Sequence, residues 1–410
     1  METIEVEVDP SEGGFDPERL DQLGAHLHRY VDDGRLPGTN VLVSRGGKVV
    51  YHDVYGCRDI ERSLPVESNT IYRFYSMTKP VTSIALMQLY EKGLLQLKDP
   101  ISKWIPAFAD TQVFVGGDAA KPQTREPLRE ISVHDLLTHT SGLTYHFHMA
   151  NTVDEMYRRA GFEWTKSPGD LENQCNVVAS LPLLFDPGTE WNYSCSTDVV
   201  GRIIELVAGV TLDQYFHDHI FDPLGMTDTG FSVSESERER FASCYYPDAK
   251  SLKATLLDDA QKSRYLREPT ALSGGGGLVS TLGDYHRFTQ ALRNGGEFEG
   301  HRIIGRKTLE FMTTNHLPGG VDLTEYGRPL FSETAYDGVG FGLGFSVVID
   351  PAKAKVLSQK GEYAWGGAAS TAFWVDPVED MTVIFLTQLL PSSTHPLRPE
   401  MKSLVYQALV

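Results

Sequence analysis

The chain has 410 residues, 41% hydrophobic and 10% aromatic, and this composition excludes a disordered chain. Its formal net charge of −18 argues against nucleic acid as a partner, because phosphate binding needs clustered Lys and Arg. No run approaches the roughly 20 apolar residues that cross a bilayer, so we expect no membrane partner either.

The N-terminus and the cysteines bear on the cellular compartment. Residues 1–14 are acidic and contain neither the basic region nor the apolar run of a signal peptide. The cysteines form no C-x-x-C pair, and scattered thiols of this kind are typical of reduced, buried residues; they are Cys57, Cys175, Cys195 and Cys244. We therefore predict a cytoplasmic protein.

The N-terminal quarter combines helical and strand patterns. The spacing of apolar residues predicts a helix over residues 16–33. Strand-like runs over 41–44 and 48–52 flank a turn with two glycines, which indicates a hairpin. From 77 to 92 the spacing is helical again, and Gly93 occupies the position of a C-terminal cap.

The rest of the chain changes character twice. Helical patterns dominate residues 99–269, at 133–137, 199–207 and 212–219, and strand signals return after Gly274, at 347–349, 371–375 and 382–387, before a last helix at about 399–408. Consecutive strands without intervening helices favour antiparallel pairing. We predict an α+β fold in which residues 1–98 and 270–410 build an antiparallel sheet flanked by helices. Residues 99–269 would form an inserted, mostly helical domain, with an active site between the two.

Several catalytic motifs are missing from the sequence. No serine lies in G-x-S-x-G, and there is no P-loop, no G-x-G-x-x-G and no H-E-x-x-H. His146 and His148 flank Phe147, but no further ligand has suggestive spacing. We therefore expect no metal and no cofactor.

An S-x-x-K motif remains, Ser76-Met77-Thr78-Lys79, followed directly by a helical pattern. Residues three apart share a helix face, so the Lys79 amine can lie beside the Ser76 hydroxyl. A serine needs such a base to act as a nucleophile, and a lysine can serve if its pKa falls towards neutrality. Taken alone, the motif more often represents a capping serine with a solvated lysine.

Further segments follow this motif in a fixed order, and they are Leu136–Leu143, Phe185–Ser194, Ser273–Thr281 and Trp365–Gly367. With them the chain resembles the serine β-lactamase-like superfamily from about residue 16 to 390. The resemblance is greatest to the class C branch and the related family VIII carboxylesterases. It implies a β-lactamase/penicillin-binding-protein-like fold.

The same resemblance implies roles for individual residues. Ser76 would be the nucleophile, Lys79 its partner, and Tyr193 the general base and then acid. The backbone N–H groups of Ser76 and Ala368 would form the oxyanion hole. Substrate-binding residues would be Trp365, Gly366, Gly367, Tyr145 and His148.

Two departures from the family pattern bear on the substrate. Cys195 stands where β-lactamases carry an asparagine that binds the antibiotic side chain, and cysteine is a poor hydrogen-bonding residue. Trp365 stands where a lysine faces the lactam carboxylate, and its neutral indole offers an apolar wall instead. Both changes favour an esterase over a dedicated β-lactamase.

We therefore predict a serine carboxylesterase that hydrolyses small to medium carboxylic esters through an acyl-enzyme on Ser76. The same site could also hydrolyse β-lactams weakly. One alternative is an acyltransferase that moves an acyl group from a thioester or ester to an alcohol. Others are a β-lactamase or D-aminopeptidase-like amide hydrolase and a non-catalytic binding member of the fold. The sequence indicates neither the acyl chain length nor the oligomeric state.

Overall fold

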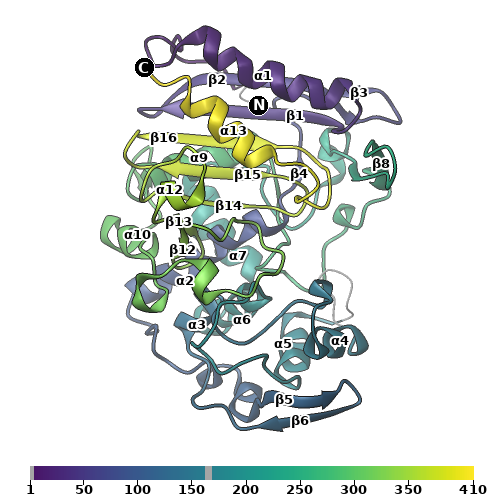
Figure 1. The fold of residues 1–410 in the computed structure, drawn as a ribbon, viewed down its shortest axis with the longest axis vertical. Coiled ribbons are helices and arrows are strands. Elements are labelled where there is room, and N and C mark those ends of the chain that lie inside the picture. The colour runs from purple at the N-terminus through teal and green to yellow at the C-terminus, as the bar shows by residue number, and fades with distance from the viewer. Residues whose placement is uncertain (1–3, 162–168) are drawn as a thin grey trace.

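A computed structural model describes residues 4–161 and 169–410. Its centre is an eight-stranded sheet with the order β12-β13-β14-β15-β16-β1-β2-β3, and every neighbouring pair is antiparallel. The strands are β1 (Gly38–Arg45), β2 (Lys48–Asp59), β3 (Leu64–Pro65), β12 (Val339–Phe341), β13 (Ser346–Val348), β14 (Tyr363–Gly366), β15 (Ala372–Asp376) and β16 (Met381–Leu386). Because β1 pairs with β16, the two ends of the chain form one sheet, and the predicted α+β architecture is confirmed (Figure 1).

Helices from both ends of the chain cover one face of this sheet, namely α1 (Pro17–Asp32) and α13 (Leu397–Tyr406) (Figure 1). Asp16 caps α1 by accepting from the backbone N–H of Arg19. The predicted apolar stripe of α1 is buried against strand residues such as Val41 and Phe385. Apolar burial of this kind attaches both helices to the sheet.

Two further helices, α2 (Thr78–Glu91) and α9 (Leu282–Arg293), belong to the other side of the sheet. Nearly every residue of α2 is buried, so this helix is enclosed by protein on all sides. On α9, Gln290 donates to the hydroxyls of Ser44 on β1 and Thr382 on β16. This network fixes α9 against the middle of the sheet.

The helices α3 to α7 of the inserted region lie together below the sheet in Figure 1. They are α3 (Val133–Leu137), α4 (Thr152–Arg159), α5 (Leu171–Ala179), α6 (Ser196–Ala208) and α7 (Leu212–Phe216), and α8 (Asp222–Leu224) follows them in the chain. The sequence did not predict two hairpins here, β5 (Val113–Asp118) with β6 (Lys121–Arg125), and β7 (Cys244–Pro247) with β8 (Ala254–Asp258). Residues of β5 and β6 are mostly exposed, so they lack the alternating burial that marks a strand.

The remaining elements are short: β4 (Tyr72–Arg73), β9 (Val279–Ser280), β10 (Glu297–Phe298), β11 (His301–Arg302), α10 (Arg306–Met312), α11 (Leu323–Tyr326) and α12 (Pro351–Ala354). The domain division at residues 98 and 269 stays a prediction. Tyr245 of β7 packs in the cluster beneath α1 and α13 and forms a bridge with Leu389, so this part of the inserted segment lies with the sheet.

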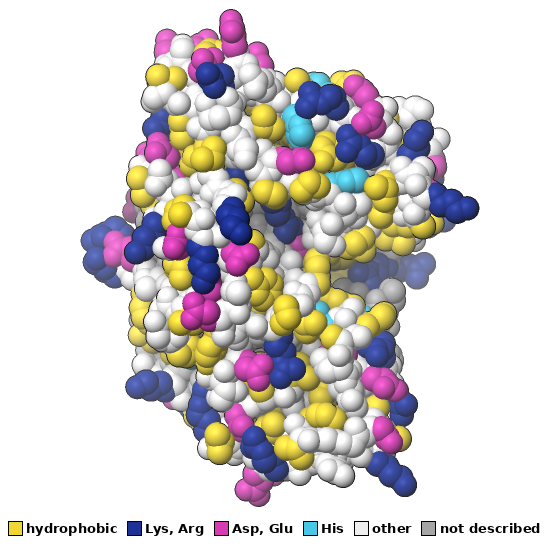
Figure 2. All heavy atoms as spheres, viewed as in Figure 1, with side chains coloured by type: hydrophobic (Ala, Val, Ile, Leu, Met, Phe, Trp, Pro, Cys, Tyr) yellow, Lys and Arg dark blue, Asp and Glu magenta, His cyan; other side chains and the backbone are white. Residues whose placement is uncertain are grey.

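The distribution of surface charge and the state of the cysteines are as expected for a folded globular chain. Figure 2 shows acidic and basic side chains interspersed over one face. All four cysteines lie in the described ranges and none forms a disulfide; three are buried and Cys57 is partly exposed. Among residues 4–161 and 169–410, no helix is long and apolar enough to cross a membrane.

Candidate active site

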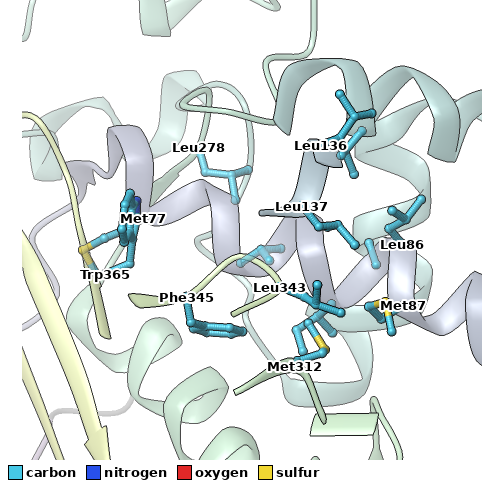
Figure 3. Packing of buried hydrophobic residues seen from close by; sticks show 14 of the residues in the cluster. Met77, Leu86, Met87, Leu136, Leu137, Leu278, Met312, Leu343, Phe345 and Trp365 are labelled. Atoms are coloured by element: carbon cyan, nitrogen blue, oxygen red, sulfur yellow. The ribbon is translucent and has the colours of Figure 1, made fainter. Parts of the chain in front are cut away.

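Ser76 lies in a single 3-10 turn, Tyr75–Met77, that leads directly into α2. The turn is held in place by a hydrogen bond from Phe74 N–H to the Leu278 carbonyl and by one from the Tyr285 hydroxyl to the Met77 carbonyl, 3.0 Å long. Tyr75 has a φ of 45°, a strained value for a residue with a side chain. Met77 packs beside Trp365 in the core (Figure 3), so the serine is presented on a fixed support.

Lys79 points its amine at the serine from within the core. Its side chain is 1% exposed, and Nζ donates to Ser76 Oγ at 3.1 Å, the Tyr145 hydroxyl at 3.0 Å and the Gly275 carbonyl at 2.7 Å. An ammonium has three donors, so these three acceptors satisfy it completely.

Tyr193 reaches the same serine from the inserted region, immediately before α6. Its hydroxyl donates to Ser76 Oγ at 2.5 Å, and its ring is 2% exposed. The backbone around it is fixed, because His148 Nε2 contacts the Tyr193 carbonyl at 2.7 Å and Asn192 donates to the Leu143 carbonyl at 2.9 Å. The structure thus brings both Lys79 and Tyr193 within hydrogen-bonding distance of Ser76 Oγ.

Burial shifts the pKa values of these groups in opposite directions. It lowers the pKa of Lys79 to about 8, although the negative charges of Asp198 and Glu333 act against the shift. It raises the pKa of Tyr193 well above 10, and the Glu333 carboxylate raises it further. A substantial neutral fraction of the amine and a protonated phenol therefore coexist near pH 8.

The sequence did not predict Asp198 as a site residue, because it lies within an apolar helical pattern and outside the motifs that mark the site. Its carboxylate accepts from Ser273 Oγ at 2.5 Å and from the Gly275 N–H at 3.0 Å. Since the Gly275 carbonyl accepts from Lys79, Asp198 holds the residue whose carbonyl contacts the amine. Burial raises the pKa of Asp198 to about 6, and Lys79 opposes this rise.

A cavity of about 460 Å³ opens over these groups. Its lining includes Ser76, Tyr145, Tyr193, Phe331, Glu333 and Ala368. The N–H of Ala368 makes no hydrogen bond with any residue of the described ranges, so it is available to a ligand. This availability is what an oxyanion hole requires.

The other predicted pocket residues differ in position. Tyr145 lines the cavity, whereas His148 lies behind it and holds the Tyr193 backbone. Trp365 is 2% exposed and packs edge-on against Tyr193 at 5.5 Å between ring centroids, so it supports the ring of Tyr193. Gly366 ends β14, and a side chain at Gly367 would collide with the carbonyl of Phe74, just before the serine turn. Substrate contact by these residues stays a prediction.

The chain is similar to known proteins over most of its length. Protein Rv1367c of Mycobacterium tuberculosis is 35% identical over 378 residues, which cover 91% of this chain and 90% of that protein. Esterase EstB of Burkholderia gladioli is 29% identical over 401 residues, covering 93% of each. The solved structure of EstCE1, a hydrolase with promiscuous acyltransferase activity, superposes with a TM-score of 0.80 at 27% identity and covers 95% of this chain and 99% of that one. A sequence profile described as Beta-lactamase matches residues 23–406, and the chain therefore belongs to the Beta-lactamase family.

Proposed function

We propose that the protein is a serine carboxylesterase that works through an acyl-enzyme on Ser76. The observation that carries this proposal is the double contact of Ser76 Oγ, with Lys79 Nζ at 3.1 Å and the Tyr193 hydroxyl at 2.5 Å. The similarity to Esterase EstB supports an ester as the substrate, and the similarity to EstCE1, which is described as a hydrolase, supports hydrolysis.

In the first step, neutral Lys79 takes the proton of Ser76 while Oγ attacks the ester carbonyl carbon. The carbonyl oxygen gains negative charge, and the N–H groups of Ser76 and Ala368 stabilise it. When the tetrahedral intermediate collapses, the bond to the alcohol oxygen breaks and the Tyr193 hydroxyl gives that oxygen a proton. Protonated Lys79, with Nζ 4.8 Å from the Tyr193 ring centroid, then returns its proton to the phenolate.

In the second step, water replaces the departed alcohol and attacks the acyl group on Ser76. The water gives its proton to the Tyr193 hydroxyl oxygen, and at the same time the Tyr193 hydroxyl gives its own proton to neutral Lys79. Collapse releases the carboxylic acid, and Lys79 gives its proton back to Ser76 Oγ. Protons and charge balance over the whole cycle.

The charges in the cavity wall favour the binding of neutral esters over that of anionic substrates. Its described lining contains two carboxylates, Asp198 and Glu333, and no lysine or arginine. A β-lactam carboxylate or the free C-terminus of a peptide would meet these charges without a partner of opposite sign. We therefore expect β-lactam hydrolysis to be far slower than ester hydrolysis.

An acyltransferase is the second candidate, and the promiscuous acyltransferase activity in the description of EstCE1 favours it. The site would be the same, with an alcohol in place of water in the second step. Incubation with an acyl ester and an added alcohol, followed by product analysis, separates the two: a hydrolase gives mainly the acid, and a transferase gives mainly the new ester.

The direct test is hydrolysis of p-nitrophenyl butyrate by the wild type and by Ser76→Ala. We expect the variant to fall to the uncatalysed rate, because no other hydroxyl occupies its position. Ser83→Ala is a matched control, since Ser83 is buried on α2, the helix that follows the serine turn, and its hydroxyl has no hydrogen-bond partner among the described residues. Equal rates for the wild type and Ser76→Ala would refute the proposal.

A further inference from the structure

A second cavity, of about 270 Å³, lies next to the cavity over Ser76. Its walls come from strands β12 to β15, from α13, and from residues 331–335, which lead from α11 to β12. More than half of its described lining residues are apolar, among them Val339, Val348 and Trp374. A cavity of this composition and size suits an alkyl or aryl group.

The charged residues of the second cavity are paired within the protein. Arg398 forms an ion pair with Glu333 at 2.6 Å, and Lys402 forms one with Glu362. These four are the only charged residues in the described lining. The second cavity therefore offers a ligand no unpaired ion, and burial of apolar surface is the main favourable interaction that it can supply.

Two residues line both cavities, Phe331 and Glu333, so their side chains belong to the wall between them. Glu333 is 3% exposed and is fixed by Arg398 and by the Ser392 hydroxyl at 2.9 Å. Phe331 is partly exposed, and its ring contacts Phe147 edge-on with 6.2 Å between the centroids. Phe331 thus supplies the apolar part of this wall.

Phe147 limits the cavity over Ser76 at a different side. It lines that cavity alone, stacks on Tyr145 with 4.6 Å between the ring centroids, and is 41% exposed. A substrate chain that extended past Phe147 would enter water. A chain that extended past Phe331 would enter the second cavity and bury its apolar surface there.

We propose that Phe331 is a specificity-determining residue, whose ring closes the cavity over Ser76 toward the second cavity and so limits the apolar chain that a substrate ester can carry. The preferred substrates are then esters with short chains. This inference rests on the proposed esterase function and adds the substrate's chain length. The limited chain belongs to the acyl half or to the alcohol half of the ester, and the experiment separates the two.

Two pairs of esters, assayed as kcat/KM in one solvent mixture, provide the test. p-Nitrophenyl butyrate and decanoate differ in the acyl chain, and ethyl and octyl butyrate differ in the alcohol. The wild type should prefer the shorter member of at least one pair. Phe331→Ala should raise the ratio of the long to the short ester in that pair about tenfold or more, because each methylene that enters the second cavity contributes roughly fourfold. Phe331→Leu should give a smaller gain.

Two further variants assign the gain to the second cavity. Phe147→Ala removes the other ring of the same contact but opens the cavity toward solvent, so it should keep the wild-type ratios. Val356 lines only the second cavity and is partly exposed in the loop between α12 and β14. Val356→Phe should therefore fill that cavity and cancel the gain when it is combined with Phe331→Ala.

The outcomes separate this inference from the proposed function. Three results overturn the role of Phe331 and leave the esterase intact: a wild type that favours the long ester in both pairs, ratios in Phe331→Ala that do not change, or a gain that Phe147→Ala reproduces or the double variant retains. A wild type that hydrolyses none of the esters above the Ser76→Ala rate overturns the esterase. Each ratio is internal to one protein, so reduced stability of a variant does not obscure it.

Discussion

At the residue scale, one physical cause assigns different roles to Lys79 and Tyr193. Burial disfavours the charged form of each group, so it lowers the pKa of the amine to about 8 and raises that of the phenol well above 10. The family resemblance led us to expect Tyr193 as the initial base. The direction of both shifts favours Lys79 as the base and Tyr193 as the proton donor in the free protein.

This assignment makes a prediction about pH. Activity needs neutral Lys79, so kcat/KM should rise with pH through about 8. The Asp198 charge raises the pKa of Lys79. Asp198→Asn should therefore lower the pKa of Lys79 and move the rising limb of the kcat/KM profile to lower pH. The measurement is the pH profile of p-nitrophenyl butyrate hydrolysis.

Asp284→Asn is the control for this pH measurement. Asp284 is also a buried carboxyl with a pKa raised to about 6, but it is not among the charges that act on Lys79. Its removal should leave the limb in place. A limb that stays put or moves to higher pH in Asp198→Asn would contradict the assigned roles.

Among the secondary-structure elements, the turn between β12 and β13 holds α2 in place. Leu343 and Phe345, on either side of Gly344, point into the cluster that also contains Met87 and Met312 (Figure 3). Gly344 has a φ of 92°, and a Cβ there would lie 2.5 Å from Ser83 Cβ on α2. Only glycine lets the turn approach the helix so closely.

Gly344→Ala should therefore destabilise the protein by about 2–4 kcal/mol, from backbone strain and the clash with α2 together. Gly361→Ala isolates the strain, because Gly361 has the same φ of 92° and nothing within 4 Å of its Cβ position. That control should cost only about 1 kcal/mol. Urea unfolding measures both values, and equal losses would show that the close approach does not matter.

Elements with a strong apolar period were predictable from the sequence, and elements without one were not. The helix predicted at 16–33 is α1, and the one predicted at 77–92 comprises the end of the serine turn and α2. Both were predictable because their buried apolar residues recur with the helical period. The β5–β6 hairpin escaped notice because its strands are mostly exposed. Among site residues, the S-x-x-K serine and lysine and the tyrosine follow motifs. Asp198 and Glu333 reach the cavity through tertiary packing that no local pattern records.

At the scale of the whole molecule, the largest hydrophobic cluster runs through the sheet region and the inserted region alike. It includes Met77 and Phe345 from the first, and Leu136, Trp191 and Ile203 from the second. The residues of the candidate site meet where these parts join, since Ser76 belongs to one and Tyr193 to the other. A shared core of this kind couples the stability of both parts.

Unfolding should accordingly be a single cooperative event. Far-UV circular dichroism, tryptophan fluorescence and esterase activity should all change at the same urea concentration. The fluorescence includes Trp191 in the inserted region and Trp374 in the sheet, both buried, so it reports on each part. Two separated transitions would show that the regions unfold independently.

The proposed reaction requires that an acyl group is attached to Ser76 during turnover. Rapid acid quenching of the wild type with p-nitrophenyl butyrate, followed by proteolysis and mass spectrometry, tests it most directly. We predict one butyryl group on the peptide that contains Ser76 in the wild type and none in Ser76→Ala. A butyryl group on another residue, or ester turnover with no covalent species at any quench time, would rule out an acyl-enzyme on Ser76.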